Sequence, residues 1–196
     1  RCTHSLRFAF MTDARFGRAI RSAWLLDPDV VFLNNGSFGA TPIEVLEVQH
    51  EWQRRFEREP LEFVGRHLHD ELRSAAQTMA AFMGSRGEDV VFVENATTGV
   101  NAVLRSIAPL LRPGDRLLTT SHVYNAVRQA MRYIAWLTGA EYVEVPVPFP
   151  IASSEEVVER VSAVLTDRTR FAVFDHVTSP TGLIFPVEQL VRLCKE

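Results

Sequence analysis

Near the middle of the chain a strand-like run gives way to a helix-like run, with two threonines and a glycine at the junction. Residues 91–93 have the β-branched and aromatic character of a buried strand, and apolar residues then recur at helical spacing over residues 100–107. Residues 97–99 therefore fall at a helix N-terminus, where free backbone N–H groups and two hydroxyls suit a phosphate monoester. Ordinary capping by Thr97 or Asn95 explains the same pattern.

The junction lacks the features of a nucleotide-binding loop. ENATTG is not followed by GK[ST], and its spacing is not the GxGxxG of a dinucleotide-binding fold. A phosphate that is held without a P-loop lysine indicates a cofactor phosphate, not a nucleotide whose phosphoryl group is transferred.

Two further segments carry side chains that could contact a flat, polar ligand. His122 and Tyr124, in SHVYNA, offer rings that could lie against a bound aromatic, but a packed tyrosine and a polar loop histidine are the ordinary alternative. Thr178 and Ser179, in DHVTSPTG, offer short hydroxyls that could hydrogen-bond the polar edge of a cofactor. Ser-Pro and Thr-Gly pairs are common in loops, so a plain turn is the alternative there.

Strands and helices are expected to alternate along the chain. The pattern predicts strands at residues 29–34, 89–94, 116–120, 141–146 and 170–175. It predicts helices at residues 12–26, 41–59, 60–84, 98–111, 124–138 and 154–165, and a last one opened by Phe185 and Pro186. Such alternation predicts an α/β fold whose parallel or mostly parallel sheet has helices on both faces, preceded by an N-terminal helical segment. Ligands of such sheets lie outside the carboxyl ends of the strands, where the three polar segments begin.

Composition excludes several classes of protein. The 196 residues are 46% hydrophobic, enough for one sizeable core, and the net charge of −3 comes from interspersed acidic and basic side chains. No basic tract could neutralise a row of phosphates, so we expect no nucleic-acid partner. No apolar run approaches the roughly 20 residues of a membrane span, and Cys2 and Cys194 lack metal-ligand spacing. A cytoplasmic protein without a metal or a membrane contact is expected.

Four motifs occur together in the order typical of one enzyme family. They are FLNNGSFGATP, ENATTGVNAVLRS, LTTSHVYNAVR and DHVTSPTGLIFPVEQL. With them the chain resembles the class V aminotransferase family of pyridoxal-phosphate enzymes, most closely its isopenicillin-N-epimerase-like branch. The resemblance implies the large domain of the fold-type I architecture, incomplete at its C-terminal end. We expect a leader at residues 1–10, a helical arm and substrate-edge segment at residues 11–60, and a partial cofactor-binding domain at residues 61–196.

The resemblance implies roles for two of the polar segments. Ala96, Thr97 and Thr98 match the loop that grips the phosphate of pyridoxal 5′-phosphate through backbone N–H groups and hydroxyls. Tyr124 is the best match for the side chain that stacks on the pyridine ring, and His122 is the second candidate.

Contacts to the phenolic oxygen of the cofactor and to the substrate are implied in the same way. Ser179 matches a polar side chain near that oxygen, with Thr178 as its neighbour. Asn35 and Ser37 resemble the segment that approaches the substrate, although the glycines around them are also ordinary loop residues.

The resemblance further implies a homodimeric enzyme that acts on an amino acid, by epimerisation at Cα or by Cβ–S cleavage as in a cysteine desulfurase or C–S lyase. In the family the lysine that binds the cofactor covalently and the acid that protonates its ring nitrogen lie further along the chain. Asp175 is not that acid, and Lys195, the single lysine, closes a helix that leads away from the ligand edge. We therefore expect a truncated chain that is inactive alone. A non-catalytic α/β protein that binds a phosphorylated small molecule is the alternative.

Overall fold

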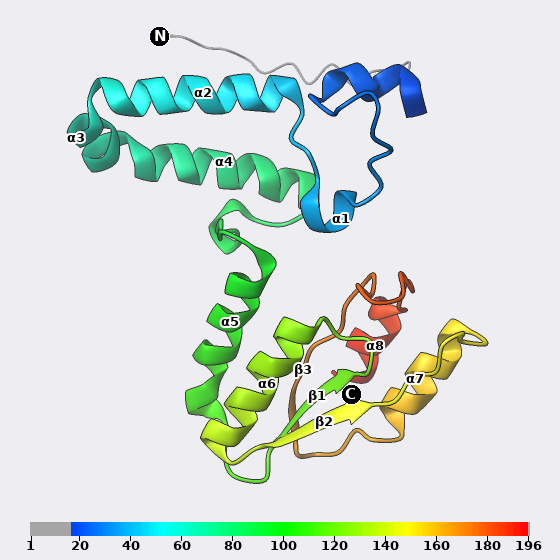
Figure 1. The fold of residues 1–196 in the computed structure, drawn as a ribbon. Helices are drawn as coiled ribbons and strands as arrows, with labels where there is room; N and C mark the ends of the chain where they lie inside the picture. Colours follow the sequence, from blue (N-terminus) through cyan, green and yellow to red (C-terminus); the bar gives the residue numbers. More distant parts are fainter. Residues whose placement is uncertain (1–16, 196) are drawn as a thin grey trace. The chain divides into compact units, whose positions relative to one another are not determined.

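The structure, a computed structural model, describes residues 17–195 and divides at Val91 and Phe92 into two compact units (Figure 1). The expected leader at residues 1–10 lies outside the described residues. The expected boundary after residue 60 falls within α3 (Pro60–Glu62), a short helix of the first unit.

The first unit is helical. Its described part contains first a 3₁₀ helix at Gly17–Ala23 and then a single α-helical turn, α1, at Asn35–Phe38. Two long helices follow, α2 at Ile43–Arg58 and α4 at Leu68–Met83. The short α3 and a π-helical turn at Phe63–His67 connect them, so that the two long helices form a hairpin (Figure 1).

Aromatic side chains pack at the closed end of this hairpin. Phe63 is buried, and the rings of Trp52 and Phe56 meet it edge-on, with centroids 6.0 and 5.9 Å away. Arg55 lies over the Trp52 ring and also pairs with Glu71 of α4 at 2.8 Å. Packing of one amphipathic face against the other stabilises the two helices more than their intrinsic propensity does.

A glycine ends α4. Gly84 has a φ of +67°, a conformation that glycine adopts without steric cost, and its N–H donates to carbonyl groups of the last helical turn. A 3₁₀ turn at Gly87–Asp89 follows. Arg73 of α4 donates to the carbonyl oxygens of Gly87 and Val90, which holds this turn against the helix.

Three parallel strands form the sheet of the second unit, in the order β2–β1–β3. They are β1 at Arg116–Thr120, β2 at Glu141–Val145 and β3 at Thr169–Ala172. In the register of the central strand, Leu118 lies beside Val143 of β2. Because β1 is paired along both edges, its carboxyl end lies between those of its neighbours.

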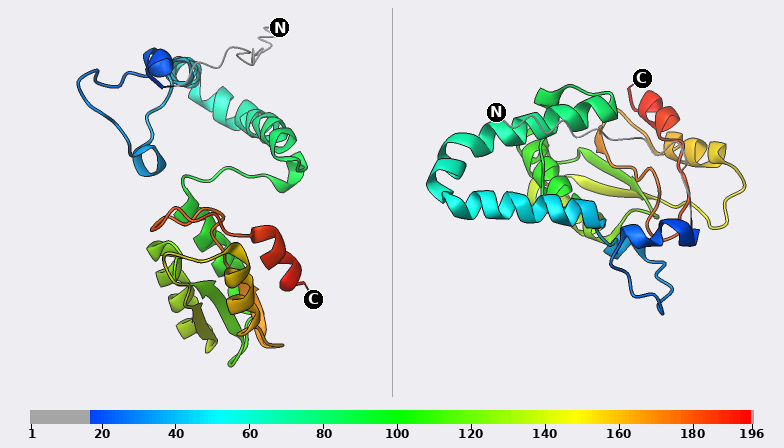
Figure 2. Two further views of the ribbon diagram at one scale, coloured as in Figure 1. Left: turned by 90° about the vertical axis from the view of Figure 1, so that its right-hand side faces the viewer. Right: turned by 90° about the horizontal axis from the view of Figure 1, so that it is seen from above.

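Helices cover both faces of this sheet, as Figures 1 and 2 show. On one face lie α5 at Ala96–Ile107, which continues into a 3₁₀ turn at Ala108–Leu110, and α6 at Asn125–Thr138. On the other face lie α7 at Ser154–Ser162 and α8 at Val187–Leu193. The expected α/β fold, with a parallel sheet between two helical layers and a helical segment before it, is confirmed.

Two adjacent leucines of β1 belong to the two opposite cores. Leu117 packs with Leu104 of α5 and Met131 of α6, whereas Leu118 packs with Leu190 of α8. This division follows from the strand geometry, because successive side chains point to opposite faces. Both leucines are completely buried, and such burial contributes about 1.5–3 kcal/mol for each side chain.

Three sequence-based expectations about secondary structure are wrong. Residues 29–34 and 89–94 form no strand in the described part of the chain, and Val31 and Val91 are 80% and 72% exposed. An apolar run becomes a strand only where a neighbouring strand offers its backbone groups, and neither segment pairs with one there. Of the helix expected at residues 12–26, the described part is a 3₁₀ helix ending at Ala23, and residues 12–16 lie outside the description.

Candidate functional site

The turns that follow β1 and β3 meet at the carboxyl edge of the sheet, and α5 and α6 begin at this edge (Figure 1). Two hydrogen bonds join the turns. Nδ1 of His122 lies 2.8 Å from Oγ1 of Thr181, and the backbone N–H of Tyr124 donates to Oδ2 of Asp175 at 3.1 Å. Segments that are distant in the sequence are thereby joined into one polar surface.

The start of α5 presents unused hydrogen-bond donors. Asn95 is the N-cap, and its side-chain oxygen accepts from the N–H of Thr98 at 2.9 Å, so the capping alternative is confirmed for this residue. Within residues 17–195, the N–H groups of Ala96 and Thr97 and the hydroxyls of Thr97 and Thr98 form no hydrogen bond. Capping therefore satisfies only part of the helix start, and the remaining donors suit an oxyanion such as phosphate.

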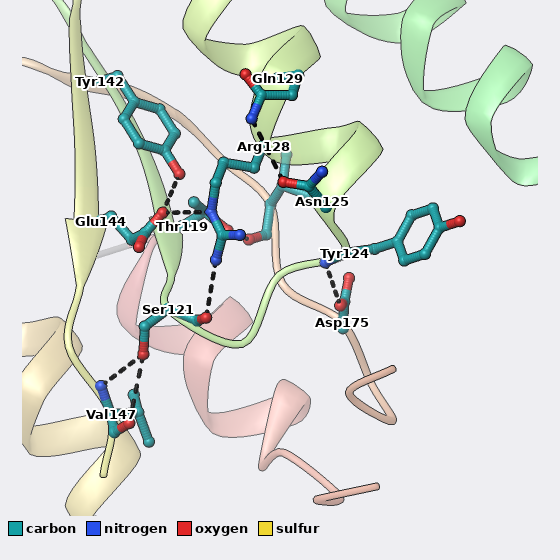
Figure 3. A network of polar contacts seen from close by, with 11 residues as sticks. Thr119, Ser121, Tyr124, Asn125, Arg128, Gln129, Tyr142, Glu144, Val147 and Asp175 are labelled. Carbon is teal, nitrogen blue, oxygen red and sulfur yellow. Dashed lines mark hydrogen bonds and ion pairs between the residues drawn. The ribbon is translucent and has the colours of Figure 1, made fainter. Parts of the chain in front are cut away.

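The turn at residues 121–124 is held by hydrogen bonds of Ser121, and Figure 3 shows those with Val147 and Arg128. The N–H of Ser121 donates to the carbonyl oxygen of Val145 at 2.9 Å. Its hydroxyl accepts from the N–H of Val147 at 3.0 Å, and its carbonyl oxygen accepts from Arg128 at 2.9 Å. A turn held in this way has little freedom to change the direction of the residues that follow it.

Tyr124 is the N-cap of α6, and its side chain makes no capping hydrogen bond. The residue is 49% exposed and its ring points away from the sheet, whereas its backbone N–H is bound by Asp175 (Figure 3). An exposed ring on a fixed backbone is suited to lie against a flat ligand.

His122 occupies a different environment from Tyr124. The residue is 6% exposed, Nε2 lies 2.9 Å from the carbonyl oxygen of Val147, and the ring packs edge-on with Phe185. With Nδ1 bound to Thr181, both ring nitrogens are used within the protein. The cofactor contact expected of His122 stays a prediction, and the contacts in the structure give the ring a role in joining the turns.

The two hydroxyl residues after β3 also differ. Thr178 is 1% exposed, and its Oγ1 lies 2.8 Å from Oγ1 of Thr181 and accepts from the N–H of Leu183 at 3.0 Å. Ser179 is exposed. Of the two, only Ser179 has a side chain at the surface, and the cofactor contacts expected of both residues stay predictions.

The two expected substrate residues lie elsewhere in the chain. Asn35 and Ser37 belong to α1 of the first unit, and both are exposed. Sequence reasoning missed Thr181 and Arg128, which hold the turns of the second unit. Thr181 could have been noticed because it belongs to a Thr-Gly pair. Nothing in the local sequence points to Arg128, because its partners come from other elements.

A charged cluster that includes Glu144 of β2 supports the turn at residues 121–124. Oε2 of Glu144 accepts from Nε of Arg128 at 2.8 Å and from the hydroxyl of Tyr142 (Figure 3). Burial raises the pKa of Glu144, but the hydrogen bonds from Tyr142 and Arg128 outweigh burial and leave that pKa below its ordinary value. Burial and the hydrogen bond to Glu144 raise the pKa of Tyr142 to about 12. Burial also raises the pKa of Asp175, against the opposing effect of the Tyr124 N–H.

The described residues lack two other kinds of feature, a membrane-spanning helix and a metal-binding cluster. None of their helices combines the length and the apolar character needed to cross a membrane. These residues also contain no group of three or more histidine, cysteine, aspartate or glutamate side chains that could hold a metal ion.

Similarity to known proteins extends over most of the chain. Over 181 residues it is 32% identical to a probable chloroplastic L-cysteine desulfhydrase of Arabidopsis thaliana, covering 86% of this chain and 38% of that protein. Over 172 residues it is 35% identical to isopenicillin N epimerase of Amycolatopsis lactamdurans, covering 87% of this chain and 42% of that protein. The chain thus spans about two fifths of the length of these relatives.

Solved structures share the fold. A mutant of C-DES with glycine covalently linked to its PLP cofactor has a TM-score of 0.76 at 20% identity, over 86% of this chain and 43% of that one. The apo cysteine desulfurase of Thermococcus onnurineus NA1 has a TM-score of 0.77 at 18% identity, over 92% of this chain and 45% of that one. The family model described as Aminotransferase class-V matches residues 31–196, which is most of the sequence. The chain therefore belongs to the class V aminotransferase family.

Proposed function

We propose that this chain supplies the pyridoxal 5′-phosphate site of an enzyme that acts on an amino acid. The observation that carries the proposal is the pairing, at one edge of the sheet, of free donors at the start of α5 with the exposed ring of Tyr124 at the start of α6. Membership of the class V family supports it, as does the solved neighbour that carries PLP.

The phosphate would lie at the start of α5. The N–H groups of Ala96 and Thr97 and the hydroxyls of Thr97 and Thr98 are its donors, and the positive end of the helix dipole favours its charge. Asn95 keeps the first turn of the helix in place by its own capping bond, so these donors are oriented before the phosphate arrives.

The ring of the cofactor would lie against Tyr124, with the exposed hydroxyl of Ser179 near its phenolic oxygen. His122 and Thr178 would support the residues around the cofactor, because their polar atoms already hold the two turns together. Bound pyridoxal phosphate supplies an electron sink for a carbanion at the Cα of an amino acid. The residues of this chain bind and orient that group.

The reaction that we favour is epimerisation at Cα, as in isopenicillin N epimerase. Cleavage of the Cβ–S bond of cysteine is the second candidate, because relatives named cysteine desulfhydrases match the same part of the chain at 32–34% identity. Both reactions begin with removal of a proton from Cα. We place Asn35 and Ser37 of α1 at the substrate, and we propose a cytoplasmic homodimer for the whole enzyme.

A comparison of two ligands tests the phosphate site. The purified protein is titrated with pyridoxal 5′-phosphate and with pyridoxal, which has the same ring without the phosphate, and binding is followed by the absorbance of the ligand. Each hydrogen bond to a charged group contributes about 1.5–3 kcal/mol, so the phosphorylated ligand should bind at least about tenfold more tightly. Inorganic phosphate should compete with it. Equal affinity for the two ligands would contradict the proposal.

A further inference from the structure

We propose that Asp175 is a positioning residue for Tyr124: by binding the backbone N–H of Tyr124, its carboxylate sets the direction in which the tyrosine ring leaves the sheet edge. This inference rests on the function proposed above, in which Tyr124 lies against the ring of the cofactor. Asp175 itself touches neither the cofactor nor the substrate.

The contact crosses between two neighbouring strands. Asp175 lies in the turn after β3, and Tyr124 ends the turn after β1, so the hydrogen bond of 3.1 Å spans 51 residues of sequence. The chain directions of two separate βα turns are thereby fixed relative to each other. Figure 3 shows the carboxylate at the backbone of Tyr124, with the tyrosine ring extending away from it.

Asp175 binds a backbone donor at the start of α6. The side chain of Tyr124, the N-cap residue, makes no capping hydrogen bond, and Asp175 binds the N–H of Tyr124 itself, the donor that the acidic side chain of a capping box binds. A carboxylate beside the first turn also interacts favourably with the positive end of the helix dipole. Asp175 is half-buried, which restricts the movement of its carboxylate. Burial also limits the access of water that would compete for the N–H of Tyr124.

Arg128 also holds this turn, through contacts that do not involve Asp175. Its side chain donates to the carbonyl oxygen of Ser121, and its backbone N–H donates to the carbonyl oxygen of Tyr124 at 3.0 Å. Tyr124 therefore has its N–H bound by Asp175 and its carbonyl oxygen bound within α6. With Arg128 in place, loss of Asp175 frees only one end of the residue, which allows the ring to turn while the helix stays folded.

A double-mutant cycle tests the inference. The variants are Asp175→Ala, Asp175→Asn, Tyr124→Leu and the double variant Asp175→Ala/Tyr124→Leu, each titrated with pyridoxal 5′-phosphate. Affinity and the circular dichroism of the bound cofactor are both measured. Asp175→Ala should weaken binding by roughly tenfold and reduce the dichroism, because coupled neighbours show interaction energies of this order. In the Tyr124→Leu background the same change should have little further effect.

Asp175→Asn and a control variant separate positioning from general loss of stability. Asp175→Asn keeps an oxygen that can accept from the N–H of Tyr124, so it should restore most of the affinity and the dichroism. Asp115→Ala is the matched control, because its carboxylate accepts from the N–H of Arg112 at 2.8 Å at the opposite end of β1. It should lower the thermal midpoint and leave the affinity unchanged.

The outcomes distinguish the inference from the proposed function. If Tyr124→Leu binds the cofactor as well as the parent protein does, the stacking role of Tyr124 in the proposed function is wrong. If Tyr124→Leu weakens binding but Asp175→Ala weakens it equally in both backgrounds, the positioning role is wrong and the stacking role stands. An affinity for Asp175→Ala that equals that of the parent protein would also overturn the positioning role.

Discussion

The side chain of Arg128 donates a hydrogen bond to the carbonyl oxygen of Ser121 at 2.9 Å, while its Nε donates to Glu144 of β2 at 2.8 Å. Arg128 lies one turn into α6, and Ser121 lies in the turn that leads into the same helix. Arg128 thus connects α6 both to the turn that precedes this helix and to the neighbouring strand β2. One planar guanidinium provides both contacts because its donors point in different directions.

Replacing Arg128 with lysine should therefore be disruptive although the charge is kept. An ammonium group at the end of a flexible stem does not reproduce the geometry of two donors in one plane. We expect a loss of about 1.5–3 kcal/mol in the free energy of unfolding, the range for a hydrogen bond to a charged group. Urea denaturation measures it. Arg105→Lys, at an exposed position of α5, is the control and should change stability by less than about 0.5 kcal/mol.

Replacing Thr97 with valine should weaken binding of pyridoxal 5′-phosphate by roughly tenfold. The change keeps the shape of the side chain and removes one donor at the start of α5, at a cost of about 1.5–3 kcal/mol for a bond to a charged group. Equilibrium dialysis measures the affinity. Thr78→Val, at an exposed position of α4, should have no effect. An unchanged affinity for Thr97→Val would place the phosphate elsewhere.

The ionisation of Tyr142 should be visible at high pH. Its pKa of about 12 lies above the ordinary value of 10.0, so between these values the unfolded chain has lost this proton while the folded chain keeps it. The free energy of unfolding should therefore fall as the pH rises from 10.0 towards 12. Absorbance of the phenolate should reveal a component with a pKa of about 12. Tyr142→Phe should remove that component, and its persistence would assign it to another tyrosine.

Lys195 should not bind the cofactor covalently. It is exposed and follows α8, whose first residue, Val187, lies close to the turn after β3, so the helix leads away from the site. Incubation with pyridoxal 5′-phosphate, reduction with borohydride and mass spectrometry of the digest should give low or scattered labelling. A stoichiometric adduct on Lys195, together with turnover of an amino acid, would contradict this expectation.

Features encoded by neighbouring residues could be predicted from the sequence. The helix that begins at Ala96, with Thr97 and Thr98 in its first turn, follows from capping and helical periodicity, which act over a few residues. The three strands of the sheet and the helices between them were found for the same reason. The apolar run at residues 89–94 predicts a strand that does not form, because strand formation depends on a partner that lies elsewhere in the chain.

The hydrogen bonds that organise the site could not be predicted in this way. His122 and Thr181 are 59 residues apart, and Tyr124 and Asp175 are 51 residues apart. Each of these side chains has an ordinary role in a turn, and only the topology of the sheet brings them together. The burial of His122 and Thr178 is likewise a property of the folded turns, with no trace in the local pattern.

The burial of Leu117 and Leu118 on opposite faces of the sheet has a consequence for the carboxyl edge, where the proposed site lies. A shift of β1 by one residue relative to its neighbours would exchange the two leucines between the helical layers. It would also move Ser121 and the start of α6 by about 3.3 Å along the strand direction. The packing of these two leucines thus sets the position of Tyr124 along the strand direction. An insertion or deletion within β1 alters the binding edge as directly as it alters the interior.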